Sequence, residues 1–302
     1  MGLFFDQFVN GIGRGVVYAS LALALVLIYR TTGLLNFAQG EMALFSTFVT
    51  WWLADKADGQ GLPIVLAIVI SAALAMVAGA IIERVLIRPV MSDKNPLNVV
   101  IVTLGMFLAI NALAALVFIK PGREALKMPS PFPTGNVSDS IGISSATLWF
   151  TLILVAQCVL LWLLFQKTRV GLALRAVASN PESARLVGID TNRMLMLGWA
   201  LAAGLGAVAG SLVAGTQTGF DVSLMQQALV YALAGAALGG FDSPVGAVVG
   251  GLIVGVAESL TVQYGHYIGV GGIELIVPFG LILVVLLVKP NGLFGRTIVE
   301  RV

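Results

Sequence analysis

The sequence predicts an all-α polytopic membrane protein with about eight to ten helices that cross the bilayer or partly re-enter it. Hydrophobic residues make up 58% of the 302-residue chain and charged residues only 11%, whereas soluble domains carry about 25% charged residues. Several windows of about 20 residues are almost purely apolar, which is long enough for a helix to cross ~30 Å of hydrocarbon. Length and composition therefore favour a single transmembrane domain, residues 1–302, over several soluble domains.

Nine apolar segments account for most of the chain. The first has no basic residue before Arg14 and continues to Tyr29, so we expect it to remain as a membrane anchor rather than a cleaved signal peptide. The short second segment, and the glycine-rich break at 239–244 between the seventh and eighth, indicate that some helices are broken or re-entrant. The segments lie at 8–29, 37–54, 62–82, 97–119, 146–165, 194–215, 224–240, 244–264 and 272–288.

The distribution of basic residues predicts the orientation, because loops on the cytoplasmic side carry an excess of Lys and Arg. We place the polar stretch 166–193 in the cytoplasm and alternate the segments from there. Twelve basic residues then lie inside: Arg30, Arg84, Arg88, Lys94, Lys167, Arg169, Arg175, Arg185, Arg193, Lys289, Arg296 and Arg301. Only Lys56, Lys120, Arg123 and Lys127 lie outside. The pattern predicts an external N-terminus and a cytoplasmic C-terminus.

The longest external loop runs from about 120 to 145 and contains four prolines that make it stiff and extended. It is either a structural connection or a docking surface for an external partner. Small residues also recur four apart in the second half of the chain, which predicts close helix packing, with gating hinges as the alternative. The pairs are Gly206/Gly210, Gly235/Gly239, Gly246/Gly250 and Gly251/Gly255.

The polar stretch 166–193 carries the signals of a short helix at 181–187. Asn180 is a favoured N-cap residue, and Pro181 fits the first helical position. Glu182 complements the helix dipole, and Gly188 suits the left-handed residue that ends a helix. A helix this short is marginal unless it packs against something. A second, amphipathic segment precedes it, with Leu172, Leu174 and Val177 interleaved with Arg169, Arg175 and Ser179.

Four stretches resemble one family. GLALRAVASNPESARLVGID at 171–190 is similar to the cytoplasmic coupling loop of permease subunits in ABC importers for branched-chain amino acids. TTGLLNFAQGE at 31–41, AALGGFDSPVG at 236–246 and KPNGLFG at 289–295 resemble that family's other signatures, in the same order. The resemblance covers nearly the whole chain and is closer to the H-type than to the M-type subunit. Asp242 stands where family members often carry a different small or polar residue, so no role is assigned to it.

The resemblance implies partners as well as a function. It implies import of branched-chain amino acids across a bacterial plasma (inner) membrane, with a second, M-type permease subunit, two cytoplasmic ATPase subunits and an external substrate-binding protein. ATP and Mg would be used by the ATPase subunits, and no cofactor is expected on this chain. None of its six lysines follows a glycine, as a Walker A loop requires. The chain is therefore not expected to be an enzyme.

In this interpretation the helix at 181–187 lies in a groove of an ATPase subunit and transmits movement to the membrane helices. Arg175 and Glu182 are its expected polar anchors, and Ala184 and Val187 its expected packing contacts. The coupling residues as a set are Arg175, Asn180, Pro181, Glu182, Ala184, Arg185, Val187 and Gly188.

Polar and ionisable residues within apolar segments are the candidates for a translocation pathway, because they are costly in lipid and usually functional. We expect Asn36, Gln39, Glu41 and Glu258 to line it. Alternatively, Glu41 locks neighbouring helices together. Glu258 and Glu274 would alternatively be solvated or paired with Arg14.

Other residues suggest no chemistry. His266 is interpreted as a loop residue, since one histidine without a neighbouring cluster makes no metal site. Cys158 lies within an apolar segment as a small hydrophobe. A net charge of +2 gives no reason to expect nucleic acid.

Other functions remain open. Similar permeases are used for urea, amides or other amino acids. A less favoured alternative is an ion-coupled secondary transporter or channel, which would need several carboxylates near the membrane midplane. A membrane-embedded enzyme is disfavoured because no catalytic cluster stands out.

Overall fold

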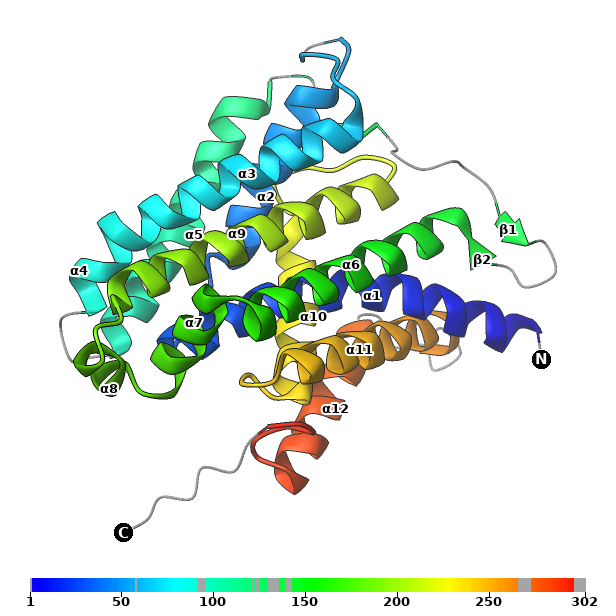
Figure 1. Cartoon of the computed structure of the whole chain (residues 1–302). Coiled ribbons are helices and arrows are strands. Elements are labelled where there is room, and N and C mark those ends of the chain that lie inside the picture. The colour runs from blue at the N-terminus through cyan, green and yellow to red at the C-terminus, as the bar shows by residue number, and fades with distance from the viewer. Residues whose placement is uncertain are drawn as a thin grey trace. The chain divides into compact units, whose positions relative to one another are not determined.

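The computed structural model describes residues 2–57, 59–91, 96–120, 122, 125–129, 136–138, 143–265 and 273–295. Most of these residues are helical (Figure 1). Two short strands, β1 (Asn136–Ser138) and β2 (Ile143–Ser144), pair antiparallel. The helices are α1 (Gly2–Thr32), α2 (Gln39–Ala54), α3 (Ile64–Ile82), the π-helical turn η1 (Glu83–Ile87), α4 (Arg88–Met91), α5 (Pro96–Phe118), α6 (Ser145–Lys167), α7 (Arg169–Ser179), α8 (Pro181–Leu186), α9 (Thr191–Thr216), α10 (Leu224–Gly239), α11 (Pro244–Gly265) and α12 (Ile273–Val288).

Each of the nine apolar segments forms a helix, which confirms the all-α membrane class. Within the described residues, six helices are long and apolar enough to cross a bilayer: α1, α3 with its continuation to Met91, α5, α6, α9 and α11. The helices α2, α10 and α12 have 16 residues each. At 1.5 Å per residue they reach about 24 Å, short of the ~30 Å hydrocarbon thickness. They are the second and seventh segments, in which broken helices were expected, and the last one; the eighth segment, also expected to be broken, forms the 22-residue helix α11.

The chain folds as two compact units. One comprises residues 1–26, 132–154 and 229–302, and the other comprises residues 27–131 and 155–228. The chain passes from one unit to the other within α1, α6 and α10. The cytoplasmic stretch expected at 166–193 lies entirely in the second unit.

The second unit is built around α2, of whose sixteen residues thirteen are buried. In this unit α9 runs alongside α3 (Figure 1). Gly206 of α9 faces Gln39 and Ala43 of α2, so that a Cβ atom at Gly206 would lie 2.7 Å from Nε2 of Gln39. Hydroxyl groups add hydrogen bonds between neighbours: Thr50 and Ser211 join α2 to α9 at 3.0 Å. Close contact and buried hydroxyls together hold helices that gain little from hydrophobic burial in lipid.

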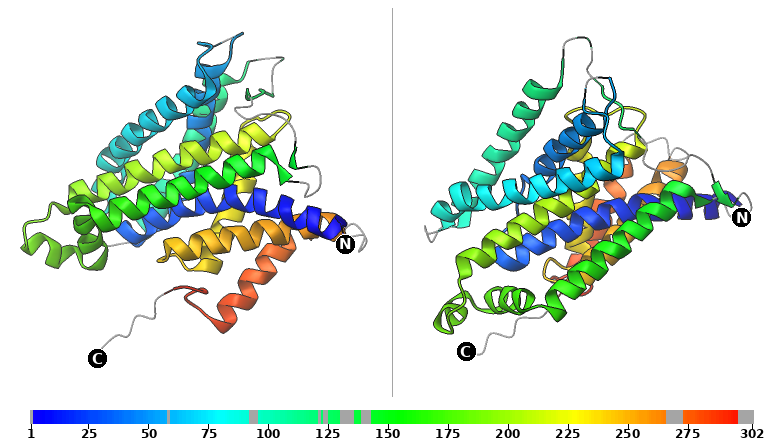
Figure 2. Two further views of the ribbon diagram at one scale, coloured as in Figure 1. Left: turned by 45° about the vertical axis from the view of Figure 1, so that its right-hand side comes forward. Right: turned by 45° about the horizontal axis from the view of Figure 1, so that its top comes forward.

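The first unit is organised by two glycine-lined faces of α11. Gly251 faces α1, since a Cβ atom there would lie 2.6 Å from both the Cα and the N atom of Ala19. Gly235 of α10 faces α11 equally closely, with a Cβ atom 2.7 Å from the Cα of Gly251. Figure 2 shows α11 lying along the N-terminal part of α1. All four small-residue pairs thus lie at helix contacts, as expected for packing.

Two of the four signature stretches, 236–246 and 289–295, meet at the break between α10 and α11. Gly240 has a φ of +102°, a backbone conformation that favours glycine, and α11 starts again at Pro244. The segment after α12 closes over the end of α10: the amide of Leu293 donates to the carbonyl of Leu238 at 2.8 Å, and Phe294 donates to Gly239 at 3.0 Å. These bonds satisfy carbonyl groups that the end of a helix leaves free.

The contact between α11 and α1 makes a stability prediction. Gly251→Ala places a methyl group against the backbone of Ala19, and such overpacking typically costs about 1–3 kcal/mol. We expect a lower midpoint of thermal unfolding for the purified protein in detergent. The matched control is Gly105→Ala in α5, where nothing lies within 4 Å and alanine favours the helix. Equal midpoints for the two variants would contradict the close contact.

Candidate functional site

The polar loop between α6 and α9 folds into the two helices that its sequence predicts. The helix α7 begins where the Thr168 hydroxyl accepts a hydrogen bond from the amide of Gly171 at 2.9 Å. Leu174 and Val177 are buried, whereas Leu172 is exposed. The amphipathic character of this segment is confirmed, with Leu172 outside the buried face.

The helix α8 runs from Pro181 to Leu186, one residue shorter than expected. The Asn180 side chain caps its start by accepting a hydrogen bond from the amide of Ser183 at 2.9 Å. At its end Gly188 has a φ of +83°, and the amide of Ile189 donates to the carbonyl of Ala184 at 3.0 Å. The caps predicted from the sequence therefore define the helix.

The apolar side chains of this loop do not all point as expected. Ala184 is only 3% exposed, so it packs against its own chain and offers no free surface. Val187 is 76% exposed, so its side chain is accessible, and its role as a contact stays a prediction. Leu186, which was not on the list of candidates, is 89% exposed. Two adjacent uncovered apolar side chains outside the membrane spans are typical of a binding surface.

Some charged side chains of the loop form hydrogen bonds within the chain, and others are exposed. Nε of Arg185 donates to the hydroxyl of Thr191 at 2.7 Å and so joins α8 to the start of α9. Arg175 donates to the side chain of Gln166 at 3.2 Å. Glu182 is exposed in the first turn of α8. Glu182 is thus open to a partner, whereas Arg175 and Arg185 also hold the loop together.

An ion pair that the sequence reasoning missed lies beside the start of α9. Glu83, fully buried in the π-helical turn, accepts two hydrogen bonds from Arg88, at 2.6 and 3.2 Å. Arg88 also donates to the backbone carbonyl of Asn192 at 3.3 Å. The only signal in the sequence was a carboxylate five residues before an arginine at the end of an apolar segment. This pair connects α3 to the residues that directly follow the loop.

Two of the four pathway candidates lie at the buried start of α2. The Asn36 side chain accepts from the amide of Ala38 at 3.0 Å and donates to Gln39 at 3.3 Å. Gln39 in turn donates to the backbone carbonyl of Ala202 in α9 at 2.9 Å. Both side chains are buried. In this structure they tie α2 to α9.

Glu41, the third candidate, is fully buried in the same unit. Its Oε2 atom accepts from the side-chain amide of Asn111 at 2.9 Å, and that amide also donates to the carbonyl of Val222 at 2.9 Å. Its Oε1 atom has no hydrogen-bond partner among the described residues. Glu41 therefore joins α2, α5 and the segment before α10, as the helix-locking alternative expects.

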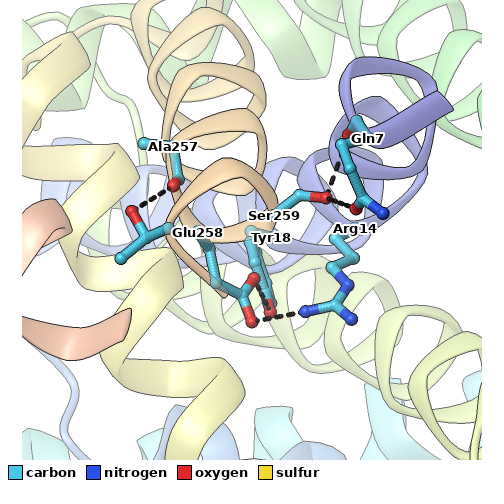
Figure 3. Close-up of polar contacts among 7 residues, drawn as sticks. Gln7, Arg14, Tyr18, Ala257, Glu258 and Ser259 are labelled. Carbon is cyan, nitrogen blue, oxygen red and sulfur yellow. Dashed lines mark hydrogen bonds and ion pairs between the residues drawn. The ribbon is translucent and has the colours of Figure 1, made fainter. Parts of the chain in front are cut away.

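Glu258, the fourth candidate, is held by two residues of α1 in the first unit (Figure 3). Arg14 donates to one carboxylate oxygen at 3.0 Å, and the Tyr18 hydroxyl donates to the other at 2.6 Å. The pairing of Glu258 with Arg14 is confirmed. His266 and the side chain of Glu274 lie outside the described residues.

A search of the described residues for three or more His, Cys, Asp or Glu side chains that could hold a metal ion finds no such group. The described residues provide instead a set of apolar helices, three buried carboxylates with polar partners (Glu41, Glu83 and Glu258), and a capped helix with exposed apolar residues beside it. These features define a multi-pass membrane protein.

Comparison with known proteins gives the family. Residues 7–286 match the family described as the branched-chain amino acid transport system permease component, and the chain belongs to that family. The chain is 31% identical to the high-affinity branched-chain amino acid transport system permease protein LivH of Salmonella typhimurium, over 99% of this chain and 98% of LivH. LivH of Escherichia coli K12 matches to the same extent, and BraD of Pseudomonas aeruginosa is 30% identical over the same shares.

The N-cap of α8 makes a prediction about local stability. Asn180→Ala removes the acceptor for the Ser183 amide, and loss of such a cap typically costs about 1 kcal/mol. We expect hydrogen exchange of the amides at 183–187 to become about fivefold faster. Thr168→Ala is the control, because it removes the cap of α7 and is expected to accelerate exchange there instead. Unchanged exchange in α8 would show that the cap does not stabilise it.

Proposed function

We propose that this chain is the H-type permease subunit of an ATP-binding-cassette importer that moves branched-chain amino acids into the cytoplasm. Membership of the permease family and the full-length similarity to LivH and BraD support this assignment. In this proposal the chain forms the passage and carries out no catalytic step. ATP and Mg belong to separate ATPase subunits.

The observation that carries the proposal is the uncovered apolar pair on the polar loop. Leu186 is the last residue of a six-residue helix and Val187 follows it; this helix is too short to be stable in isolation but is capped at both ends. Such a helix suits a groove on a cytoplasmic ATPase subunit. Exposed Glu182 would supply a charged contact at the edge of that groove.

The loop is also connected to the membrane helices in a way that suits transmission of movement. Arg185 bonds Thr191 at the start of α9, and Arg88 bonds the next residue, Asn192, while it holds Glu83 of the π-helical turn. A displacement of α8 would therefore reach both α9 and α3. This is a mechanical input of the kind that switches a transporter between inward-open and outward-open states.

The proposed orientation has the N-terminus outside and the C-terminus in the cytoplasm of a bacterial plasma membrane. Basic residues gather at the loop end of the second unit, where Arg30 lies 5.9 Å from the ring centre of Phe165 and Arg88 lies beside Asn192. Leu126 and Phe220, from the two loops expected outside, pair through their backbones. The arrangement supports one basic, cytoplasmic end for this unit.

The proposed complex contains a second, M-type permease subunit, two ATPase subunits and an external substrate-binding protein. The external loop at 120–145, for which a structural connection is the alternative, would be the docking surface for the binding protein; much of it lies outside the described residues. Among the pathway candidates, Asn36, Gln39 and Glu41 would act by changing their interhelical bonds during the cycle. Glu258 would act through Arg14.

The substrate class and the energy source have alternatives. Urea, short amides or other amino acids would suit the same scaffold, with the external binding protein choosing among them. An ion-coupled transporter or channel would leave Leu186 and Val187 without a partner. Copurification of a cytoplasmic ATPase and ATP-dependent uptake of labelled leucine would support the importer. Uptake by this chain alone, driven by protons or sodium, would overturn it.

The coupling surface is tested by Leu186→Glu combined with Val187→Glu. Two carboxylates in an apolar groove would be desolvated without partners, so we expect ATPase copurification and leucine uptake to fall on the order of tenfold or more. Membrane insertion should not change, because both side chains are exposed. Arg193→Gln is the control, an exposed side chain just beyond the loop that should leave uptake intact. Normal uptake in the double variant would exclude this surface.

A further inference from the structure

The guanidinium of Arg14 is paired on one side only. Only Nη1 bonds Glu258, and no other hydrogen bond joins its guanidinium to the described residues. Its side chain is 48% exposed, whereas that of Glu258 is 6% exposed. Glu258 has both oxygens engaged, one by Arg14 and one by Tyr18 (Figure 3). The pair is therefore complete on the carboxylate side and open on the guanidinium side.

The open side of Arg14 belongs to a polar stripe on α1. Asp6, Asn10 and Arg14 follow each other at intervals of four residues, so they share one helix face, and all three are exposed. Glu258, the partner of Arg14, lies seven residues before the end of α11 at Gly265, which is about 10 Å along the helix. The guanidinium thus lies well within the length of the helices. At such a depth an exposed charged group faces water or protein rather than lipid.

We propose that this stripe lines a water-filled cavity and that Arg14 binds a carboxylate there, the α-carboxylate of the transported amino acid. The identity of the ligand rests on the proposed function. The planar fork of an arginine matches a carboxylate with two parallel hydrogen bonds. Nε and Nη2, the two donors left over by Glu258, form one edge of that fork.

The neighbouring groups fit this assignment. Glu258 is a positioning residue, since it fixes the guanidinium through one nitrogen and offsets the cost of holding a cation inside the bundle. Tyr18 fixes Glu258 in turn at 2.6 Å. Asn10 lies one helical turn away, and its amide oxygen can accept a hydrogen bond from an ammonium group. A free amino acid carries both of the groups that these residues would recognise.

Accessibility is the first test, on the complete permease–ATPase complex in lipid with Cys158→Ser as the background. Cys158 is the chain's only cysteine, so Asn10→Cys adds a single thiol to it. Leu108→Cys is the control, at a highly exposed apolar position in α5. We expect water-soluble thiosulfonates to modify Asn10→Cys at least about tenfold faster than Leu108→Cys, as read by mass spectrometry of this chain.

Ligand protection is the second test. Leucine should slow modification of Asn10→Cys, whereas leucinamide, which lacks the carboxylate, should not. Arg14→Lys keeps the charge but loses the fork, so protection should need about tenfold more leucine. In Arg14→Gln with Glu258→Gln, which leaves no unpaired buried charge, protection should vanish.

Three results would overturn the proposal. They are equal modification of Asn10→Cys and Leu108→Cys, equal protection by acid and amide, and loss of the second permease subunit from the Arg14→Gln, Glu258→Gln complex, which would make the stripe a subunit interface. Uptake by the unmodified complex separates this proposal from the proposed function. If that complex takes up no amino acid but another carboxylate protects Asn10→Cys, the carboxylate site stands and only the assigned substrate fails.

Discussion

The close approach of α11 to α1 is the contact on which the first unit depends. In lipid, helices gain little from burying apolar surface against each other, so they are held by van der Waals contact at small residues and by interhelical hydrogen bonds. Gly11 and Gly15 of α1 lie so near α11 that a Cβ atom at either would meet a backbone Cα at 2.7 or 2.8 Å. That short separation lets Arg14 and Tyr18 reach Glu258 from the neighbouring helix. The glycines thus set the geometry of the network of Arg14, Tyr18 and Glu258 in Figure 3.

In the second unit, more of the contacts between helices are hydrogen bonds of polar side chains. Gln39 bonds the backbone of α9, and Thr50 bonds Ser211. Near the loop, Arg88 bridges Glu83 and the backbone of Asn192. A buried carboxylate that loses its cation is left uncompensated, so such a pair breaks only at a high cost. A displacement of α8 is therefore expected to move α9 and α3 together rather than to separate them.

The sequence predicted the features that depend on local chemistry. The nine apolar segments, the Asn180 cap and the left-handed Gly188 follow from residue type and spacing, and each occurs in the structure. Features that depend on how helices face each other could not be predicted. Ala184 and Leu186 are two residues apart in a helix and both apolar, so only the path of the chain decides that the first is buried. Glu83 was overlooked for a different reason: a π-helical turn brings it to Arg88, five residues later, whereas pairs in a regular helix are three or four residues apart.

Glu258 shows what tertiary structure adds to a buried carboxylate. From the sequence it was equally a pathway residue and a partner of Arg14, and a lone carboxylate in an apolar segment suits both descriptions. The pathway role and the pairing role are compatible because Arg14 and Glu258 differ in exposure. A purely structural lock would bury both charges, because an ion pair open to solvent contributes little to stability. Here the carboxylate is buried and fully bonded while the guanidinium faces outward with unused donors. Because of this difference, Glu258 positions the guanidinium and Arg14 is the group available to a ligand.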